Sequence, residues 1–261
     1  MEFLQGIHIP VEADSVLDPE VYYGDKTTGI FFETQDGFFG RITFYALDAI
    51  KVCRGEAMPY KYDWENYQSG TWIFRVQNSK WLKERFNYEN EHCGNSYQFD
   101  GNVNEMLSDF SHYYFLFHDQ FVEVIARGFW FEKDTESLFG KALKPGHPFL
   151  PLPETGKQTI IAHNLVCQIR TNKTPVEEII LNSQYCPQKL FEFALELDGQ
   201  ANFGHTVTLS SKNGELTSSL NGYFGNEAVK FNGIITLEQV KPYIETHMHD
   251  VYERRKAMGK N

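Results

Sequence analysis

The sequence predicts an α+β protein built on aromatic-rich, mainly antiparallel sheets, with a few short helices and an amphipathic C-terminal helix. Aromatic residues make up 15% of the 261 residues, chiefly as 22 Phe and 14 Tyr, and such side chains favour pleated strands. Residues 113–132 place two aromatic and β-branched runs around the polar break His118–Gln120, which is the pattern of a buried β-hairpin. Asp-Gly and Asn-Gly turn signals separate other short segments, which is typical of antiparallel strands.

Signals for one more hairpin, a further strand and two helices precede this central hairpin. Residues 29–34 and 38–45 are expected to pair around the turn at Asp36-Gly37, and residues 47–54 can continue the second strand. The other elements expected here are a strand at 71–76, a helix capped by Ser79, and a helix at 102–110 in which Asn102 and Glu105 form a capping box.

Alternation along the second arm of the central hairpin separates two faces of the strand. One face carries Val122, Val124, Ala126 and Trp130, and the other carries Phe121, Glu123, Ile125 and Arg127. The first set is the better candidate for the core, because all of its members are apolar.

Four prolines within a short stretch mark the clearest boundary in the chain. They lie in the connector 141–158, and proline at this density is not compatible with a helix or a central strand. The connector separates an N-terminal α+β part, residues 1–140, from a C-terminal α+β part, residues 159–261. The two parts can equally form one domain, because Phe149 and Leu150 of the connector could pack against a core.

The C-terminal part is expected to alternate strands with two helices. The expected strands are 159–170, 190–197, 205–211, 215–220 and 228–235, with Asn213-Gly214 as a hairpin turn. Thr174 and Pro175 start one helix, which ends before Pro187. The C-terminal helix begins near Thr236, and Pro242 should kink or restart it. Its buried stripe is predicted to contain Leu237, Val240, Ile244, Met248 and Val251.

The formal net charge of −11 weighs against nucleic acid as a partner, because nucleic-acid affinity depends largely on Lys and Arg displacing counterions. No apolar run reaches the roughly 20 residues that a membrane helix needs, and the first residues do not resemble a secretory signal. The four scattered cysteines are therefore expected to be reduced thiols. These observations predict a soluble cytoplasmic protein that contacts neither nucleic acid nor membrane.

No motif for binding a phosphate, a dinucleotide or catalytic zinc occurs in the chain, so no cofactor is predicted. His247 and His249 lie two residues apart on a helix and point about 200° apart, which prevents them from sharing a metal ion. The adjacent His118 and Asp119 fit a hairpin turn better than an acid–base pair. No catalytic residue and no metal ligand is therefore predicted.

The segment 60–67 is the best candidate for a binding surface. Its aromatic residues alternate with acids and an amide, without the apolar periodicity of a core strand, and Tyr and Trp are enriched at binding hot spots. The alternative is a loop that packs its rings against its own domain. The predicted binding residues are Tyr60, Tyr62, Asp63, Trp64, Glu65 and Tyr67.

An acidic, aromatic-rich chain without catalytic motifs favours a non-enzymatic binding protein with a protein partner. One form of this hypothesis is an acidic inhibitor or immunity-type protein that masks a basic toxin or nuclease through charge complementarity. The alternative is an enzyme or small-molecule-binding protein with an apolar pocket inside a β-sheet. Its candidate polar groups are His112, His118, Glu123, Arg127 and His163.

Overall fold

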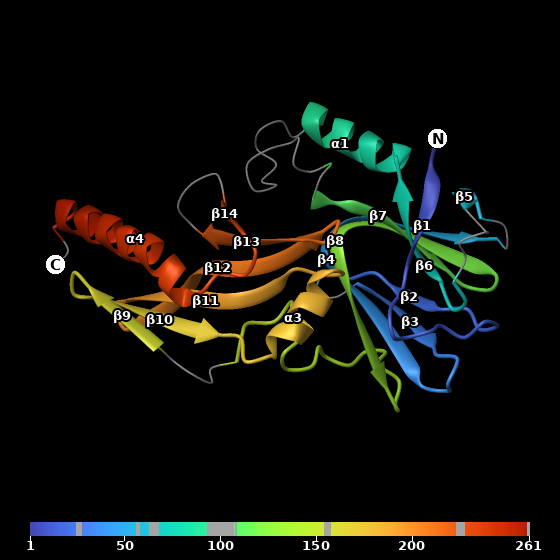
Figure 1. The fold of residues 1–261 in the computed structure, drawn as a ribbon, viewed down its shortest axis with the longest axis horizontal. Coiled ribbons are helices and arrows are strands. Elements are labelled where there is room, and N and C mark those ends of the chain that lie inside the picture. Colours follow the sequence, from blue (N-terminus) through green and yellow to red (C-terminus); the bar gives the residue numbers. More distant parts are fainter. Residues whose placement is uncertain are drawn as a thin grey trace. The chain divides into compact units, whose positions relative to one another are not determined.

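The structure is a computed structural model, and it divides into two compact units, Met1–Ala142 (unit 1) and Leu143–Asn261 (unit 2) (Figure 1). It describes residues 1–24, 28–55, 58–62, 68–92, 107, 109–153, 158–222 and 228–259. Both units combine an antiparallel-rich sheet with helices, so the predicted α+β class is confirmed. Most of the helix expected at 102–110 lies outside the described residues.

Unit 1 is built on an eight-stranded sheet with the order β2-β3-β4-β8-β7-β6-β1-β5. All neighbouring strands are antiparallel except β1 and β5, which are parallel. The strands are β1 (Phe3–Ile7), β2 (Glu20–Tyr22), β3 (Gly29–Glu33), β4 (Phe39–Arg54), β5 (Lys61–Tyr62), β6 (Ile73–Gln77), β7 (Ser111–Leu116) and β8 (Gln120–Asp134), and the described helix of this unit is α1 (Lys80–His92).

The predicted central hairpin is present as β7 and β8, and its second arm is buried on both faces, not only on the face chosen as the better candidate for the core. Val122 and Val124 are fully buried, as predicted, yet Ile125 on the opposite face is also fully buried, and Trp130 is partly exposed. The second face is covered because α1 packs there, with Leu82 in one apolar cluster with Ile125. A strand buried on both faces carries mixed residues on each, so alternation alone did not identify the core.

A bulge in β4 connects this strand to α1. The pairing between β4 and β8 shifts register between Leu47 and Ala49, and Ala46 has a positive φ of 48°. The extra residue places Asp48 within 3.0 Å of the Nε of Arg85 in α1. A bulge redirects one side chain without ending the strand, which explains why β4 continues to Arg54.

The guanidinium of Arg41, on β4, links the sheet of unit 1 to the segment that follows β8. Its exposed fraction is 1%, and its Nε lies 2.7 Å from Glu132 on the neighbouring strand β8. Its Nη1 donates to the carbonyl of Lys141 at 2.6 Å, and weaker contacts of 3.5 Å reach the carbonyls of Leu138 and Ala142. Arg41 therefore fixes the segment that follows β8 onto the sheet.

Unit 2 contains a six-stranded antiparallel sheet with the order β14-β13-β12-β11-β10-β9. Its elements are β9 (Gln158–Ala162), β10 (Leu165–Thr171), α3 (Val176–Ser183), β11 (Gln188–Leu197), β12 (Gln200–Lys212), β13 (Glu215–Gly222), β14 (Val229–Asn232) and α4 (Leu237–Ala257).

Turn chemistry decides the boundaries of these strands. Asn213 and Gly214 both have positive φ and join β12 to β13, as predicted. The single strand expected at 159–170 was wrong, because His163 and Asn164 adopt positive φ and form a hairpin turn between β9 and β10. A turn made by two non-glycine residues carries a weaker sequence signal than Asn-Gly, although His and Asn are both enriched at positive φ.

One face of the unit 2 sheet supports the helices. Phe193, Val207 and Leu209 are fully buried in a cluster that includes Val240 and Met248 of α4. The predicted stripe and the capping box of Thr236 with Gln239 are both present in α4, which continues through Pro242 without a restart. Within the described residues, no helix combines the length and the apolar character needed to cross a membrane.

Candidate functional site

The structure describes only two of the six predicted binding residues, and both pack against unit 1. The Tyr62 ring in β5 lies 5.1 Å from the Phe74 ring, measured between centroids. The Tyr60 ring packs edge-on against Tyr114, and its hydroxyl donates to Glu123. Asp63, Trp64, Glu65 and Tyr67 lie outside the described residues, so a binding surface at 60–67 stays a prediction.

Tyr60 leads into a buried polar network that joins the sheet to the start of α1. His112 of β7 lies between two partners, with its Nδ1 2.9 Å from Ser79 Oγ and its Nε2 2.8 Å from Glu123 Oε2. The exposed fractions of Ser79, His112 and Glu123 are 5%, 1% and 6%. The side chains lie on one face of the sheet, because His112 pairs with Ile125, the second residue after Glu123.

Hydrogen-bond roles in this network follow from the position of Ser79 before α1. Its Oγ accepts the backbone N–H of Leu82 at 3.0 Å, which is the contact of a helix N-cap. The Ser79 hydroxyl can then donate its hydrogen to His112 Nδ1, which leaves the imidazole proton on Nε2, facing Glu123. This tautomer is inferred from the partners of the ring, because the hydrogen positions themselves are assigned from the hydrogen-bond network.

Burial and hydrogen bonding act in opposite directions on the Glu123 carboxyl. Burial raises its pKa, but the hydrogen bonds from His112 and Tyr60 outweigh burial and hold the pKa below its usual value. Burial and the neighbouring Glu123 together raise the pKa of the Tyr60 hydroxyl. The network thus holds the Glu123 carboxylate between two hydrogen-bond donors, which stabilises the buried charge.

The order of hydroxyl, imidazole and carboxylate groups resembles that of the catalytic groups in a serine hydrolase, but Ser79 lacks the access to substrate that catalysis needs. Ser79 is buried, and its oxygen already accepts a hydrogen bond from the helix. One further buried group, the Tyr114 hydroxyl, has no hydrogen-bond partner within the described residues. We therefore interpret the network chiefly as the connection that holds α1 on the sheet.

Other polar candidates from the sequence do not join this network. His118 lies at the exposed hairpin tip, as the turn interpretation expects, although its Nδ1 lies 2.8 Å from the Asp119 carboxylate, a side-chain contact that this interpretation did not expect. Arg127 lies over the Phe110 ring. His163 belongs to unit 2, where its ring stacks on Tyr252. Of the five groups, His112 and Glu123 alone come together within the described residues.

Two histidines of α4 face different partners, as predicted from helix geometry. The His247 ring lies 4.6 Å from the His205 ring of β12, and the His249 ring lies 4.7 Å from the His163 ring, measured between centroids. Within the described residues, no group of three or more His, Cys, Asp or Glu side chains is arranged to hold a metal ion. His247 is buried, whereas His249 is exposed.

We expect His247 to make unit 2 less stable as the pH falls from about 6.5 to about 4. Burial, with a smaller effect of His205, lowers the pKa of His247 to about 4 from the ordinary value of 6.5. The unfolded chain then binds a proton in this pH range while the folded chain does not, so acid favours unfolding. The expected loss is about 2 kcal/mol, allowing for partial solvent screening.

Urea unfolding followed by circular dichroism at pH 7 and pH 4.5 measures this effect. His247→Gln should reduce the loss of unfolding free energy between pH 7 and pH 4.5 by about 2 kcal/mol. The matched change His249→Gln at the exposed position should leave this loss unchanged. An identical pH dependence of the unfolding free energy in wild type and His247→Gln would show that protonation of His247 does not destabilise unit 2 in acid.

The net negative charge of the chain comes from unit 1. Residues 1–142 contain 23 Asp and Glu against 12 Lys and Arg, whereas residues 143–261 contain 12 of each. Unit 1 therefore carries the whole formal charge of −11, and unit 2 is balanced. The composition of the whole chain conceals this asymmetry, which appears once the chain is divided near the proline-rich connector.

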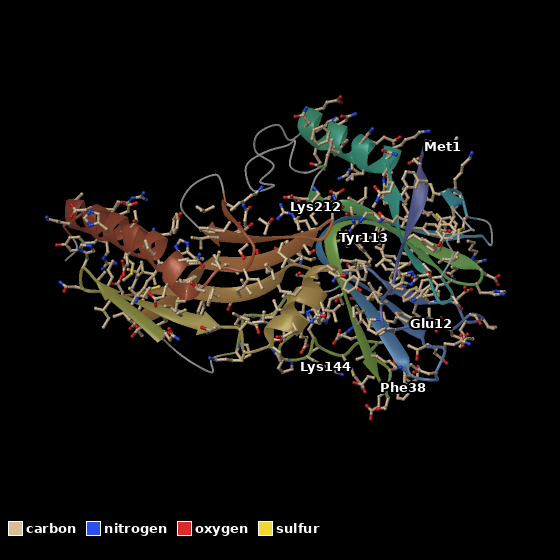
Figure 2. The ribbon with its side chains drawn as sticks, viewed as in Figure 1. Met1, Glu12, Phe38, Tyr113, Lys144 and Lys212 are labelled. Carbon is tan, nitrogen blue, oxygen red and sulfur yellow. The ribbon has the colours of Figure 1, made fainter. Side chains whose placement is uncertain are left out.

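Part of this charge lies beside exposed aromatic rings at one edge of the unit 1 sheet. We define the β2 edge surface as the exposed side chains of Asp18, Glu20, Tyr22, Tyr23, Glu33 and Phe139. The Phe139 ring contacts Phe31 edge-on at a centroid distance of 5.1 Å and Tyr22 at 6.2 Å. Glu12, labelled in Figure 2, belongs to the same acidic N-terminal part of unit 1.

Sequence reasoning missed this surface because its members come from separated segments. Phe139 contacts Tyr22 from the segment after β8, which Arg41 holds through the carbonyl of Lys141. The acidic residues of 12–20 were visible in the sequence, but their distance from aromatic rings was not.

Searches of protein-family models, curated proteins and solved structures found no match to this chain.

Proposed function

We propose that this protein is a non-enzymatic intracellular binding protein that uses unit 1 to bind a basic protein partner. In its most specific form, it is an inhibitor or immunity-type protein that masks a basic toxin or nuclease in the cytoplasm. The single observation that supports the proposal is the segregation of the whole net charge into unit 1. A concentrated acidic surface steers a basic partner and suppresses partners of like charge.

The alternative, an enzyme or a small-molecule-binding protein, has one observation in its favour. His112 and Glu123 converge, and the Tyr114 hydroxyl lies buried nearby without a hydrogen-bond partner in the described part of the chain. We rank this alternative second, because the Ser79 hydroxyl is buried and engaged with α1. A catalytic nucleophile must reach its substrate, and this oxygen does not meet that condition.

We expect removal of three acidic charges from the β2 edge surface to weaken binding to basic proteins about tenfold. The variant combines Asp18→Asn, Glu20→Gln and Glu33→Gln, and each exposed charge contributes up to about 0.5 kcal/mol at low ionic strength. Titration by interferometry against a basic ribonuclease, a basic lysozyme and cytochrome c, at low and physiological salt, measures the change.

A matched control removes three exposed charges from unit 2 through Glu215→Gln, Glu245→Gln and Glu253→Gln. Both variants gain the same net charge, so the control should change affinity by less than about twofold if unit 1 is the binding unit. An equal loss of affinity in both variants would show that the basic proteins are held by nonspecific charge attraction and not by unit 1. Failure of all three basic proteins to bind at low salt would overturn the proposed function.

A further inference from the structure

We infer that an extended, cationic segment of the partner docks at the β2 edge surface. The segment adds to the sheet as a further strand beside β2. This inference rests on the proposed function and names the place and the kind of ligand. It requires a free strand edge, exposed side chains that can hold a partner, and a charge pattern that selects a basic one. These three features occur together at the β2 edge surface.

The strand edge is provided by β2, which is the first strand in the sheet order. Within the described residues it pairs with β3 alone, in antiparallel register from Glu20 opposite Phe31 to Tyr22 opposite Gly29 (Figure 1). The outer edge of such a strand presents backbone groups that can form hydrogen bonds with an added strand. Peptide recognition by strand addition uses this arrangement.

Aromatic side chains give this edge a place to hold a partner. Tyr22 and Phe139 are each 50% exposed, and Tyr23 is 72% exposed. The contacts of Phe139 with Phe31 and Tyr22 fix the orientation of the rings before any partner arrives. Preoriented aromatic rings contribute binding energy at a small cost in conformational entropy.

The charge pattern identifies the ligand as cationic. Glu20 and Glu33 are exposed and have no cationic partner within the described residues, whereas nearby Lys133 and Lys141 are engaged by Asp36 and Glu136. Glu20 and Tyr22 are two residues apart, so both project from the same face of β2. The complementary strand therefore carries Lys or Arg two residues from an apolar side chain, on the face that meets Glu20 and Tyr22.

The same pattern disfavours a second copy of this chain as the occupant. Pairing of two β2 edges would bring Glu20 and its neighbours close to the same acids of the other copy, and like charges on adjacent strands are destabilising. An acidic edge thus prevents self-association while it accepts a basic strand, which is a known use of charged edge residues.

The test uses the full chain and a synthetic ten-residue peptide, KTFTKTFTKT, acetylated and amidated at its ends, in which Lys and Phe alternate on one face of the extended strand. Hydrogen exchange measured by mass spectrometry should show protection of residues 17–24 when the peptide binds at low salt. The matched peptide with N-methyl groups at consecutive backbone nitrogens of its central residues has the same charge, but neither of its edges can pair with β2 there. We expect it to bind at least about tenfold more weakly.

Protein variants separate the docking strand from general attraction. Glu20→Lys should weaken the peptide at least about tenfold, and Glu20→Gln should weaken it about threefold, while Glu215→Lys at an exposed position of unit 2 should change it less than about twofold. For each variant, hydrogen exchange in the absence of peptide and circular dichroism are compared with those of the wild type to establish that unit 1 remains folded.

Two results would overturn the docking strand while the proposed function stands. One is binding of basic proteins that depends on unit 1 but protects no backbone amide in residues 17–24. The other is equal binding of the peptide and its N-methylated form. A concentration-dependent dimer that protects residues 17–24 without peptide would assign the edge to a second copy and also overturn the inference. If neither the peptide nor any basic protein binds at low salt, the inference and the proposed function fall together.

Discussion

Arg41→Ala is expected to lower the free energy of unfolding of unit 1 by about 3 to 5 kcal/mol, the range found when one partner of a buried ion pair is removed. The guanidinium is almost completely buried and holds Glu132 together with backbone carbonyls of the segment after β8. Without it, a buried carboxylate and the carbonyl of Lys141 lose their donor. The segment carrying Phe139 should then leave the sheet, and the β2 edge surface should lose one of its rings.

Arg54→Ala provides a matched control on the same strand, because Arg54 is exposed near the other end of β4. It should change the free energy of unfolding by less than about 0.5 kcal/mol. Urea unfolding followed by tryptophan fluorescence measures unit 1 specifically, since all four tryptophans, at positions 64, 72, 81 and 130, lie in Met1–Ala142. Equal midpoints for the two variants would show that Arg41 does not hold the segment after β8.

His112→Ala should destabilise unit 1 by about 3 kcal/mol, the second large effect. The change removes the donor to the Glu123 carboxylate and the acceptor of the Ser79 hydroxyl, and it leaves a cavity beside Trp81. A buried charge without a partner costs several kcal/mol, and α1 loses its connection to β7. His118→Ala at the exposed tip of the same hairpin should have almost no effect.

Coupling between His112 and Glu123 distinguishes a lost interaction from a simple cavity. In a double-mutant cycle with Glu123→Gln, the two changes together should cost less than the sum of the single changes by about 1 to 2 kcal/mol. Additive effects would mean that the Nε2 of His112 and the Glu123 carboxylate do not interact in the folded protein. The fluorescence assay used for Arg41 applies unchanged, because Trp81 contacts the His112 ring.

Local signals predicted much of each unit. The turn at Asn213-Gly214, the capping box at Thr236 and the spacing of Val240, Ile244 and Met248 gave the correct elements, because each depends on residues within a few positions of one another. The turn at His163-Asn164 was missed because it contains no glycine, and it is stabilised by the pairing of β9 with β10.

Polar sites were harder to predict than elements. Tyr60 was selected as an exposed binding residue because its neighbours alternate aromatic and acidic side chains, yet its hydroxyl points to a carboxylate 63 positions away in the chain. Glu123 was placed on the less apolar face of β8, and that assignment was correct, but nothing near it in the sequence indicated that α1 would cover it. Contacts of this range depend on the folding of the whole sheet.

The sequence by itself determined the α+β class, the main hairpins, the apolar stripe of the last helix and the acidic character of the chain, because periodicity, turn residues and charge are properties of neighbouring residues or of composition. Only the tertiary structure decided that Arg41 and Glu123 are buried with partners and that Phe139 contacts Tyr22. A polar residue is buried or exposed according to which distant groups can satisfy it, and strand order rather than local preference brings those groups together.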